Sequence, residues 1–91
     1  MTYYFLELSE AEPRVLLLGY PLSLSETEYG ILCSLCREHP SPLSIDSLAT
    51  EHSLSANGVA VHICTLNKKA ARISGRRLIV FDGGYRLNKF M

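Results

Sequence analysis

Residues 59–73 constrain the fold of this chain more than any other segment. Apolar side chains recur there at steps of four, three, four and three residues, at Val59, Ile63, Leu66, Ala70 and Ile73. This spacing aligns them along one face of an α-helix. The opposite face carries Val61, Thr65, Lys68 and Arg72, with His62, Asn67 and Lys69 on its flanks. The segment therefore predicts a helix, ended by Ser74-Gly75, with one side in a core and a cationic, hydrogen-bonding row on the other.

Two helices are predicted before it. Ser25-Glu26-Thr27-Glu28 is a capping box, in which the Ser25 hydroxyl accepts a hydrogen bond from the Glu28 amide and the Glu28 carboxylate reaches back. The helix that starts here should run to about Glu38 and end at His39-Pro40. Its apolar stripe consists of Tyr29, Leu32, Leu35 and Cys36. Ser44 caps a shorter helix that should run to about Glu51, with Ile45 and Leu48 facing inward.

Strands are predicted at both ends of the chain. Before the helices we expect strands at Tyr3–Leu8, Val15–Leu18 and Leu22–Leu24, with a polar turn at Ser9–Pro13 and a tight turn at Gly19–Pro21. After the helices, Arg77–Phe81 and Tyr85–Lys89 flank Asp82-Gly83-Gly84, a strong hairpin signal because the turn requires positive φ.

This order of elements predicts an α+β fold, a winged helix-turn-helix in one domain over residues 1–91. Residues 1–24 form a small antiparallel N-terminal sheet, residues 25–73 a three-helix core, and residues 76–89 a β-hairpin wing. A third helix with a cationic face fits the major groove of DNA, and the hairpin can lie over the adjacent groove and backbone.

Composition excludes several classes of protein. The longest apolar run, Val15–Leu18, is far too short to cross a bilayer, and the N-terminus lacks the basic start of a secretory signal. Three cysteines are an odd number, which favours reduced thiols in the cytoplasm. No catalytic constellation or phosphate-binding glycine loop appears, so we expect neither an enzyme nor a cofactor.

A metal site is the alternative that the cysteines raise. Cys33-x-x-Cys36-x-x-His39 places two thiols and an imidazole at helical spacing, and Cys64 offers a fourth ligand. Structural zinc sites usually bring two separate ligand pairs, however, and Cys36 belongs to the apolar stripe. We therefore predict no metal.

Charge is divided unequally between the two parts of a chain whose net charge is zero. Residues 1–54 carry eight acids and two bases, a net charge of −6, whereas residues 55–91 carry seven bases and one acid, a net charge of +6. Such asymmetry indicates a polyanion-binding face on an otherwise neutral body, although a basic patch can also face an acidic protein.

Three sequence motifs of the chain resemble motifs of one known family. Residues 22–32 (LSLSETEYGIL) are similar to the opening of the first helix in OmpR/PhoB-type response-regulator effector domains, residues 59–69 (VAVHICTLNKK) to their recognition helix, and residues 79–87 (IVFDGGYRL) to their wing. Residues 14–24 resemble the N-terminal strands. The resemblance implies a DNA-binding transcription regulator of the two-component type, here without a receiver domain.

The family pattern also suggests which residues meet DNA, and where this chain departs from it. His62, Lys68, Lys69, Tyr85 and Arg86 keep the family's residue types, whereas Thr65, Asn67, Ile79 and Phe81 replace residues that contact DNA in the family, and Asn57 stands where the helix usually begins with an arginine. The predicted DNA-binding residues are His62, Thr65, Asn67, Lys68, Lys69, Arg72, Arg76, Arg77, Tyr85 and Arg86.

Their expected roles follow from their chemistry. Lys68, Lys69 and Arg72 would neutralise phosphates, and Thr65 and Asn67 would bond base edges. For His62, a phosphate contact and a structural role at the helix boundary both stay open, and for Phe81 we expect packing. Without the family's arginines, guanine readout should be weak, so any specificity should depend on A·T-rich shape or on thymine methyl groups.

Two functions remain open from sequence alone. The first is DNA binding, with double-stranded DNA as the partner. The second is a degenerate winged helix that acts as a protein-protein adaptor or anti-regulator, which the missing arginines and the zero net charge favour. A positive band across Lys68, Arg72, Arg77 and Lys89 would support DNA. The resemblance adds RNA polymerase or another regulatory protein, and a homodimer, as candidate partners.

Overall fold

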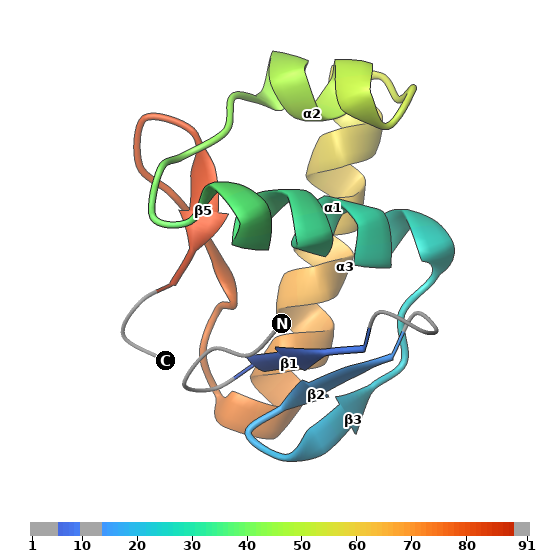
Figure 1. The fold of residues 1–91 in the computed structure, drawn as a ribbon, viewed down its shortest axis with the longest axis vertical. Coiled ribbons are helices and arrows are strands. Elements are labelled where there is room, and N and C mark those ends of the chain that lie inside the picture. The colour runs from blue at the N-terminus through green and yellow to red at the C-terminus, as the bar shows by residue number, and fades with distance from the viewer. Residues whose placement is uncertain (1–5, 10–13, 89–91) are drawn as a thin grey trace.

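The computed structural model describes residues 6–9 and 14–88, which form eight secondary-structure elements around one core (Figure 1). In chain order these are β1 (Leu6–Leu8), β2 (Val15–Leu17), β3 (Tyr20–Leu22), α1 (Glu26–Glu38), α2 (Ile45–Glu51), α3 (Ala56–Ser74), β4 (Ile79–Phe81) and β5 (Tyr85–Leu87). The predicted winged-helix order, three strands, three helices and a hairpin, is confirmed.

The N-terminal sheet is antiparallel, with strand order β1-β2-β3. The prediction of its third strand at Leu22–Leu24 is wrong: the turn lies at Leu18-Gly19, both with positive φ, and β3 begins at Tyr20. Pro21 was assigned to the turn but pairs with Leu16 in the sheet. β3 lies at the edge, where a proline's missing N–H costs no ladder hydrogen bond. The predicted first strand is observed at Leu6–Leu8, and its earlier part lies outside the described residues.

The helix caps follow the sequence closely. The capping box of α1 is formed, with the Ser25 amide donating to Glu28 Oε1 at 2.9 Å and the Glu28 amide to Ser25 Oγ at 3.2 Å. Ser44 caps α2, and Gly75 ends α3 in the left-handed conformation at φ 74°. Sequence reasoning missed Ser55, whose hydroxyl caps α3 by accepting from the Gly58 amide at 3.0 Å.

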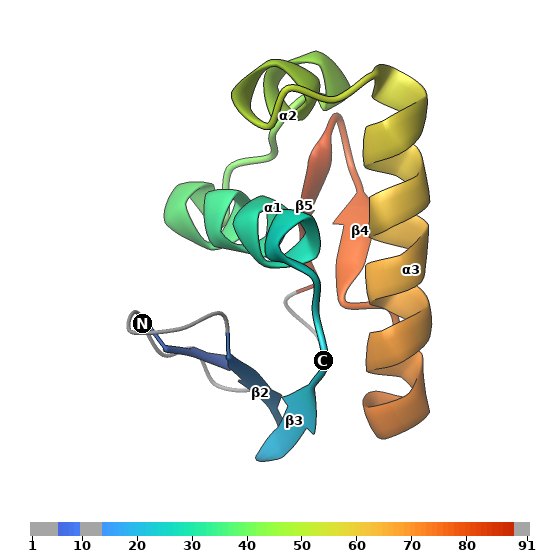
Figure 2. The same ribbon diagram turned by 90° about the vertical axis from the view of Figure 1, so that its right-hand side faces the viewer.

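The core lies where α3 meets α1 and the two sheets. The predicted stripe of α3 faces it: Val59, Ile63, Leu66 and Ala70 are buried and Ile73 is half-buried. From the other elements the core receives Leu6, Val15, Leu17, Ile31, Leu32, Leu35, Cys36, Leu48, Leu78, Ile79 and Leu87, among others. Figure 2 shows the consequence for α3, which stands at the edge of the molecule with α1, α2 and both sheets on one side of it.

The wing is the β4–β5 hairpin, in which Ile79 pairs with Leu87 and Phe81 with Tyr85. Both of its strands are shorter than the predicted ranges. A bridge to the segment between α1 and α2 anchors the hairpin: the Leu43 amide donates to the Tyr85 carbonyl at 2.9 Å, and the Tyr85 amide donates to the Leu43 carbonyl at 2.8 Å. The wing is thus held on the same body as α3. Within the described residues, no helix has the length and apolar character needed to cross a membrane.

Candidate nucleic-acid interface

The outer face of α3 is the open cationic surface of this fold. Val61 and three cations, Lys68, Arg72 and Arg77, are exposed, the last from the loop that leads into β4. Within residues 6–9 and 14–88, none of the three cations forms an ion pair. α3 contains no acidic residue. Their positive charge is therefore available to a ligand.

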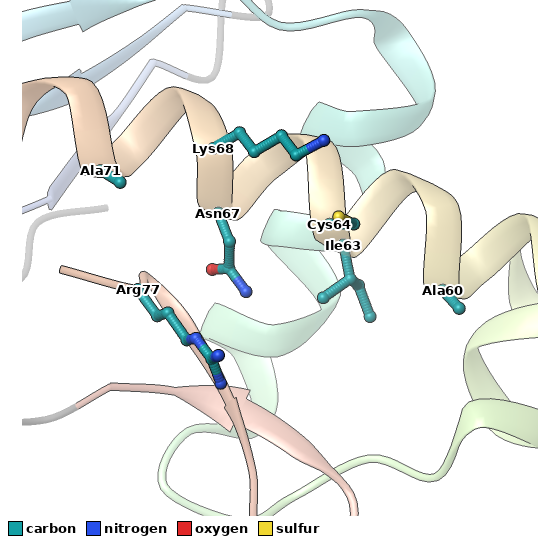
Figure 3. A pocket seen from close by; sticks show the side chains of 7 residues that line it. All are labelled: Ala60, Ile63, Cys64, Asn67, Lys68, Ala71 and Arg77. Atoms are coloured by element: carbon teal, nitrogen blue, oxygen red, sulfur yellow. The ribbon is translucent and has the colours of Figure 1, made fainter.

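An open hollow of about 430 Å³ lies between α3 and the loop that leads into β4. Its lining consists of Ala60, Ile63, Cys64, Asn67, Lys68, Ala71 and Arg77. Figure 3 shows Lys68 on α3 extending in the direction of Cys64, with Arg77 on the loop that leads into β4. The hollow is thus apolar along its floor and has one cation on each side.

Asn67, a predicted contact to DNA, bonds the wing instead. Its side-chain amide donates to the Ile79 carbonyl at 3.0 Å, and its carbonyl oxygen accepts from the Ile79 amide at 2.8 Å. Both polar atoms of the side chain are thereby used on the free edge of β4. Asn67 holds α3 and the wing at a fixed distance, and sequence reasoning gave no sign of this role.

Lys69, predicted to neutralise phosphate, is also engaged within the fold. Its Nζ lies 2.7 Å from the Ser23 carbonyl oxygen and 2.9 Å from Glu28 Oε1. Glu28 is buried and at the same time caps α1. Burial raises the pKa of Glu28, but hydrogen bonds from the Ser25 backbone and from Lys69 outweigh it and hold the pKa below its ordinary 4.5. Lys69 therefore compensates a buried carboxylate.

The wing residues among the predicted contacts are likewise packed. Arg86, whose side chain is 16% exposed, donates to Asp82 Oδ2 at 3.3 Å and to the Leu87 carbonyl at 3.0 Å. Tyr85 is half-buried, and its ring meets the ring of Phe81 edge to face with centroids 5.2 Å apart. Phe81 itself is 70% exposed. Arg86 therefore shapes the tip of the wing.

The remaining predicted contacts lie on or beside α3. His62 and Thr65 are half-buried, and the Thr65 hydroxyl donates to the Val61 carbonyl one turn earlier at 3.1 Å. Arg76 is exposed in the loop after α3. Lys89, the last member of the expected positive band, lies outside the described residues. The structure thus brings Lys68 and Arg77 to the same hollow, with Arg72 one turn beyond Lys68 on α3.

Comparison with known proteins gives no match among family models or among curated proteins. Solved structures do match. The DNA-binding domain of the response regulator AdeR, in complex with an intercistronic region, is 25% identical over 96% of both chains, with a TM-score of 0.78. The C-terminal DNA-binding domain of RstA from Klebsiella pneumoniae is 22% identical over 98% of this chain and 88% of that one, with a TM-score of 0.80.

The chain has the fold of an OmpR/PhoB-type effector domain. The resemblance inferred from its motifs is thereby confirmed. A protein described as one of a novel family of streptococcal redox sensors that evolved from two-component response regulators is also similar, with a TM-score of 0.82 and 21% identity over 96% of this chain. This chain spans 41% of the length of that protein.

A polar cluster joins α1 to α2. The buried Ser34 Oγ lies within hydrogen-bond distance of the Gly30 carbonyl oxygen and of the Glu51 carboxylate, and it lies 2.9 Å from His52 Nε2. Arg37 pairs with Glu51 at 2.8 Å and lowers the pKa of that carboxyl. Ser34 is 1% exposed, so its hydroxyl cannot reach a substrate. This polar cluster could not be predicted from the sequence because its members come from two different helices.

The three cysteines of the chain occupy three environments. Cys33 is half-buried, Cys36 is buried and Cys64 is exposed. Burial, followed by the neighbouring Cys33, raises the pKa of the Cys36 thiol to about 12, which keeps it protonated. Among residues 6–9 and 14–88, no three His, Cys, Asp or Glu side chains gather in a way that could hold a metal ion.

Proposed function

We propose that this chain is a DNA-binding transcription-regulator domain, with α3 in the major groove and the β4–β5 wing on the adjacent backbone. The observation that carries the proposal is the outer face of α3, which is free of acids and presents unpaired cations on an edge of the molecule. An α-helix fits the major groove of B-DNA, which is about 12 Å wide. The match to the AdeR domain, whose structure contains an intercistronic region, supports the same partner.

The hollow between α3 and the loop that leads into the wing suits the sugar-phosphate backbone. A helix in one groove and a hairpin over the next leave one backbone strand to pass between them. Lys68 and Arg77 line the two sides of the hollow, and Arg72 lies one turn beyond Lys68. Cations on both sides of the hollow would neutralise phosphates, and this neutralisation is the sequence-independent part of DNA affinity.

The proposed contacts differ from those expected from sequence. They are His62, Thr65, Lys68, Arg72, Arg76, Arg77 and Tyr85. Asn67, Lys69 and Arg86 are left out because their polar groups are already bonded inside the fold. The proposed activity is binding, with no catalytic step.

The adaptor alternative required a basic patch interrupted by acids and lying beside an apolar area. α3 carries no acid, and the single acid of the wing, Asp82, is paired with Arg86. We therefore favour DNA. RNA polymerase or another regulatory protein and a second copy of the chain remain proposed partners, and a cytoplasmic location remains part of the proposal.

The test is fluorescence anisotropy of a labelled duplex of about 25 bp titrated at several salt concentrations. We compare the chain with Lys68→Ala/Arg77→Ala and with Arg14→Ala, an exposed cation on the N-terminal sheet. Each phosphate contact contributes about −0.9 to the slope of log K against log salt, so the double variant should flatten the slope by about 2.

Arg14→Ala should leave the slope unchanged. A double variant with the slope of the unsubstituted chain would show that the hollow does not bind backbone. Absence of binding at low salt to both A·T-rich and mixed duplexes would exclude the DNA function.

A further inference from the structure

Several polar side chains that the sequence offered for DNA contact, including both residues expected to bond base edges, are hydrogen-bonded within the fold. Thr65 donates its hydroxyl to the Val61 carbonyl, and both polar atoms of Asn67 are bonded to Ile79. Lys69 and Arg86 are held by carboxylates and carbonyl oxygens of the fold. Base recognition by this chain therefore has to use the groups that remain on the outer face.

The groups that remain in the N-terminal half of α3 are mostly apolar. Val61 is 55% exposed, Cys64 is exposed, and Thr65 keeps its methyl group once the hydroxyl is engaged. Cys64 and Thr65 follow Val61 by three and four residues, so both are neighbours of Val61 on the helix surface. Asn57 is exposed one turn before Val61 on the same face. The first half of a recognition helix is the part that contacts base edges.

Such a surface discriminates between base pairs. In the major groove, A·T and G·C pairs both present acceptors and a donor, which lose water without gaining a partner when they meet an apolar surface. Thymine presents a C5-methyl group, which gains from the same contact. An asparagine side chain at the edge of the surface matches the donor and acceptor of adenine. The chemistry on this face therefore favours A·T pairs.

We propose that α3 reads thymine methyl groups through an apolar window formed by Val61, Cys64 and the Thr65 methyl, with Asn57 bonding adenine beside it. The inference rests on the proposed DNA function and names its substrate class: duplex sites that place thymine methyl groups under the first half of α3. Lys68, Arg72 and Arg77 supply affinity without sequence preference.

The experiment removes the methyl groups and leaves the base pairs. A labelled duplex of about 25 bp with an alternating A·T centre is compared with the same duplex carrying uracil for thymine, at fixed low salt. Uracil differs from thymine only at C5. Affinity should fall about fourfold for each methyl group in contact with the window. A third duplex with a G·C centre should bind more weakly, and replacing its cytosines by 5-methylcytosine should recover part of the loss.

Two variants locate the effect. Val61→Ala is on an exposed helical position, so it should fold normally, and it should reduce the thymine-to-uracil affinity ratio towards one. Lys68→Ala should weaken binding to both duplexes by the same factor and keep the ratio. Equal binding to the thymine and uracil duplexes, or a ratio that Val61→Ala leaves unchanged, overturns the window while DNA binding stands. Failure to bind any duplex overturns the proposed function and the window together.

Discussion

Replacing Asn67 by alanine should loosen the wing from α3. The Asn67 side chain makes two hydrogen bonds to the backbone of Ile79, at 2.8 and 3.0 Å, on the edge of β4 that does not face β5. Ile79 is 2% exposed. Alanine keeps the helix intact, since it is the best helix former, so the change removes the contact and little else.

The magnitude follows from the groups left behind. A buried backbone donor or acceptor without a partner costs about 1–3 kcal/mol. Two such groups set an upper limit of about 6 kcal/mol. Asn67 lines the open hollow beside the wing, however, and water entering there will satisfy part of the lost bonding. We therefore expect the free energy of unfolding to fall by about 2 kcal/mol, a large part of the roughly 5–15 kcal/mol of a typical domain.

Urea unfolding followed by circular dichroism measures the loss, with Asn57→Ala as the matched control. Asn57 is an exposed asparagine on the first turn of the same helix, and its replacement should change the free energy of unfolding by less than about 0.5 kcal/mol. Asn67→Asp adds a second test. Its carboxylate cannot donate to the Ile79 carbonyl until it is protonated, so its penalty should shrink as the pH falls through about 4. Equal stability of Asn67→Ala and Asn57→Ala would refute the stabilising role of the two hydrogen bonds between Asn67 and Ile79.

Two further substitutions test the charges and the turn that position the site. Since the pKa of Glu28 is held below 4.5 in the folded chain, its ionised form contributes stability above that pH, and the contribution is lost as the pH falls through the folded pKa. Urea midpoints measured from about pH 7 to about pH 3 should thus fall less steeply in Glu28→Gln, and parallel curves would contradict the role of Lys69. Gly84→Ala should cost at least about 2 kcal/mol, because φ is 146° and the new Cβ would lie 2.9 Å from the Leu43 carbonyl oxygen. Gly83→Ala, with φ 69° and open space around it, should cost only about 1 kcal/mol. Equal losses in the two variants would contradict the close approach of the wing to the segment between α1 and α2.

Local signals in the sequence were sufficient for the helices. The capping box at Ser25, the cap at Ser44 and the glycine after Ser74 act within one turn of the chain, and the stripe from Val59 to Ala70 repeats with the helical period. The third strand was misplaced because Pro21 is a turn residue by composition. Its place at a sheet edge, which makes it acceptable in a strand, depends on the pairing of β2 and β3.

The site was harder to predict because polar side chains find partners far along the chain. Asn67 and Ile79 are twelve residues apart, and Lys69 and Glu28 forty-one. A helical projection separates the buried face of α3 from the exposed one, but Asn67 and Lys69 lie on its flanks, where a side chain can turn either way. Only the packing of α1 and the wing against α3 decides that both turn inward.

Some cations of the chain are paired with carboxylates within the fold, and others are exposed without an ion pair. This difference explains how a chain of zero net charge offers a basic face, and it sets how strongly that face can bind DNA. Arg37, Lys69 and Arg86 are paired with Glu51, Glu28 and Asp82. Lys68, Arg72 and Arg77 remain unpaired within the described residues, and three phosphate contacts give a salt slope of only about −3. Such a term supports weak binding at physiological salt. Tight binding then requires a second copy on a neighbouring half-site, because each bound copy raises the effective concentration of the next. The number of unpaired cations thus supports the proposal of a homodimer on DNA.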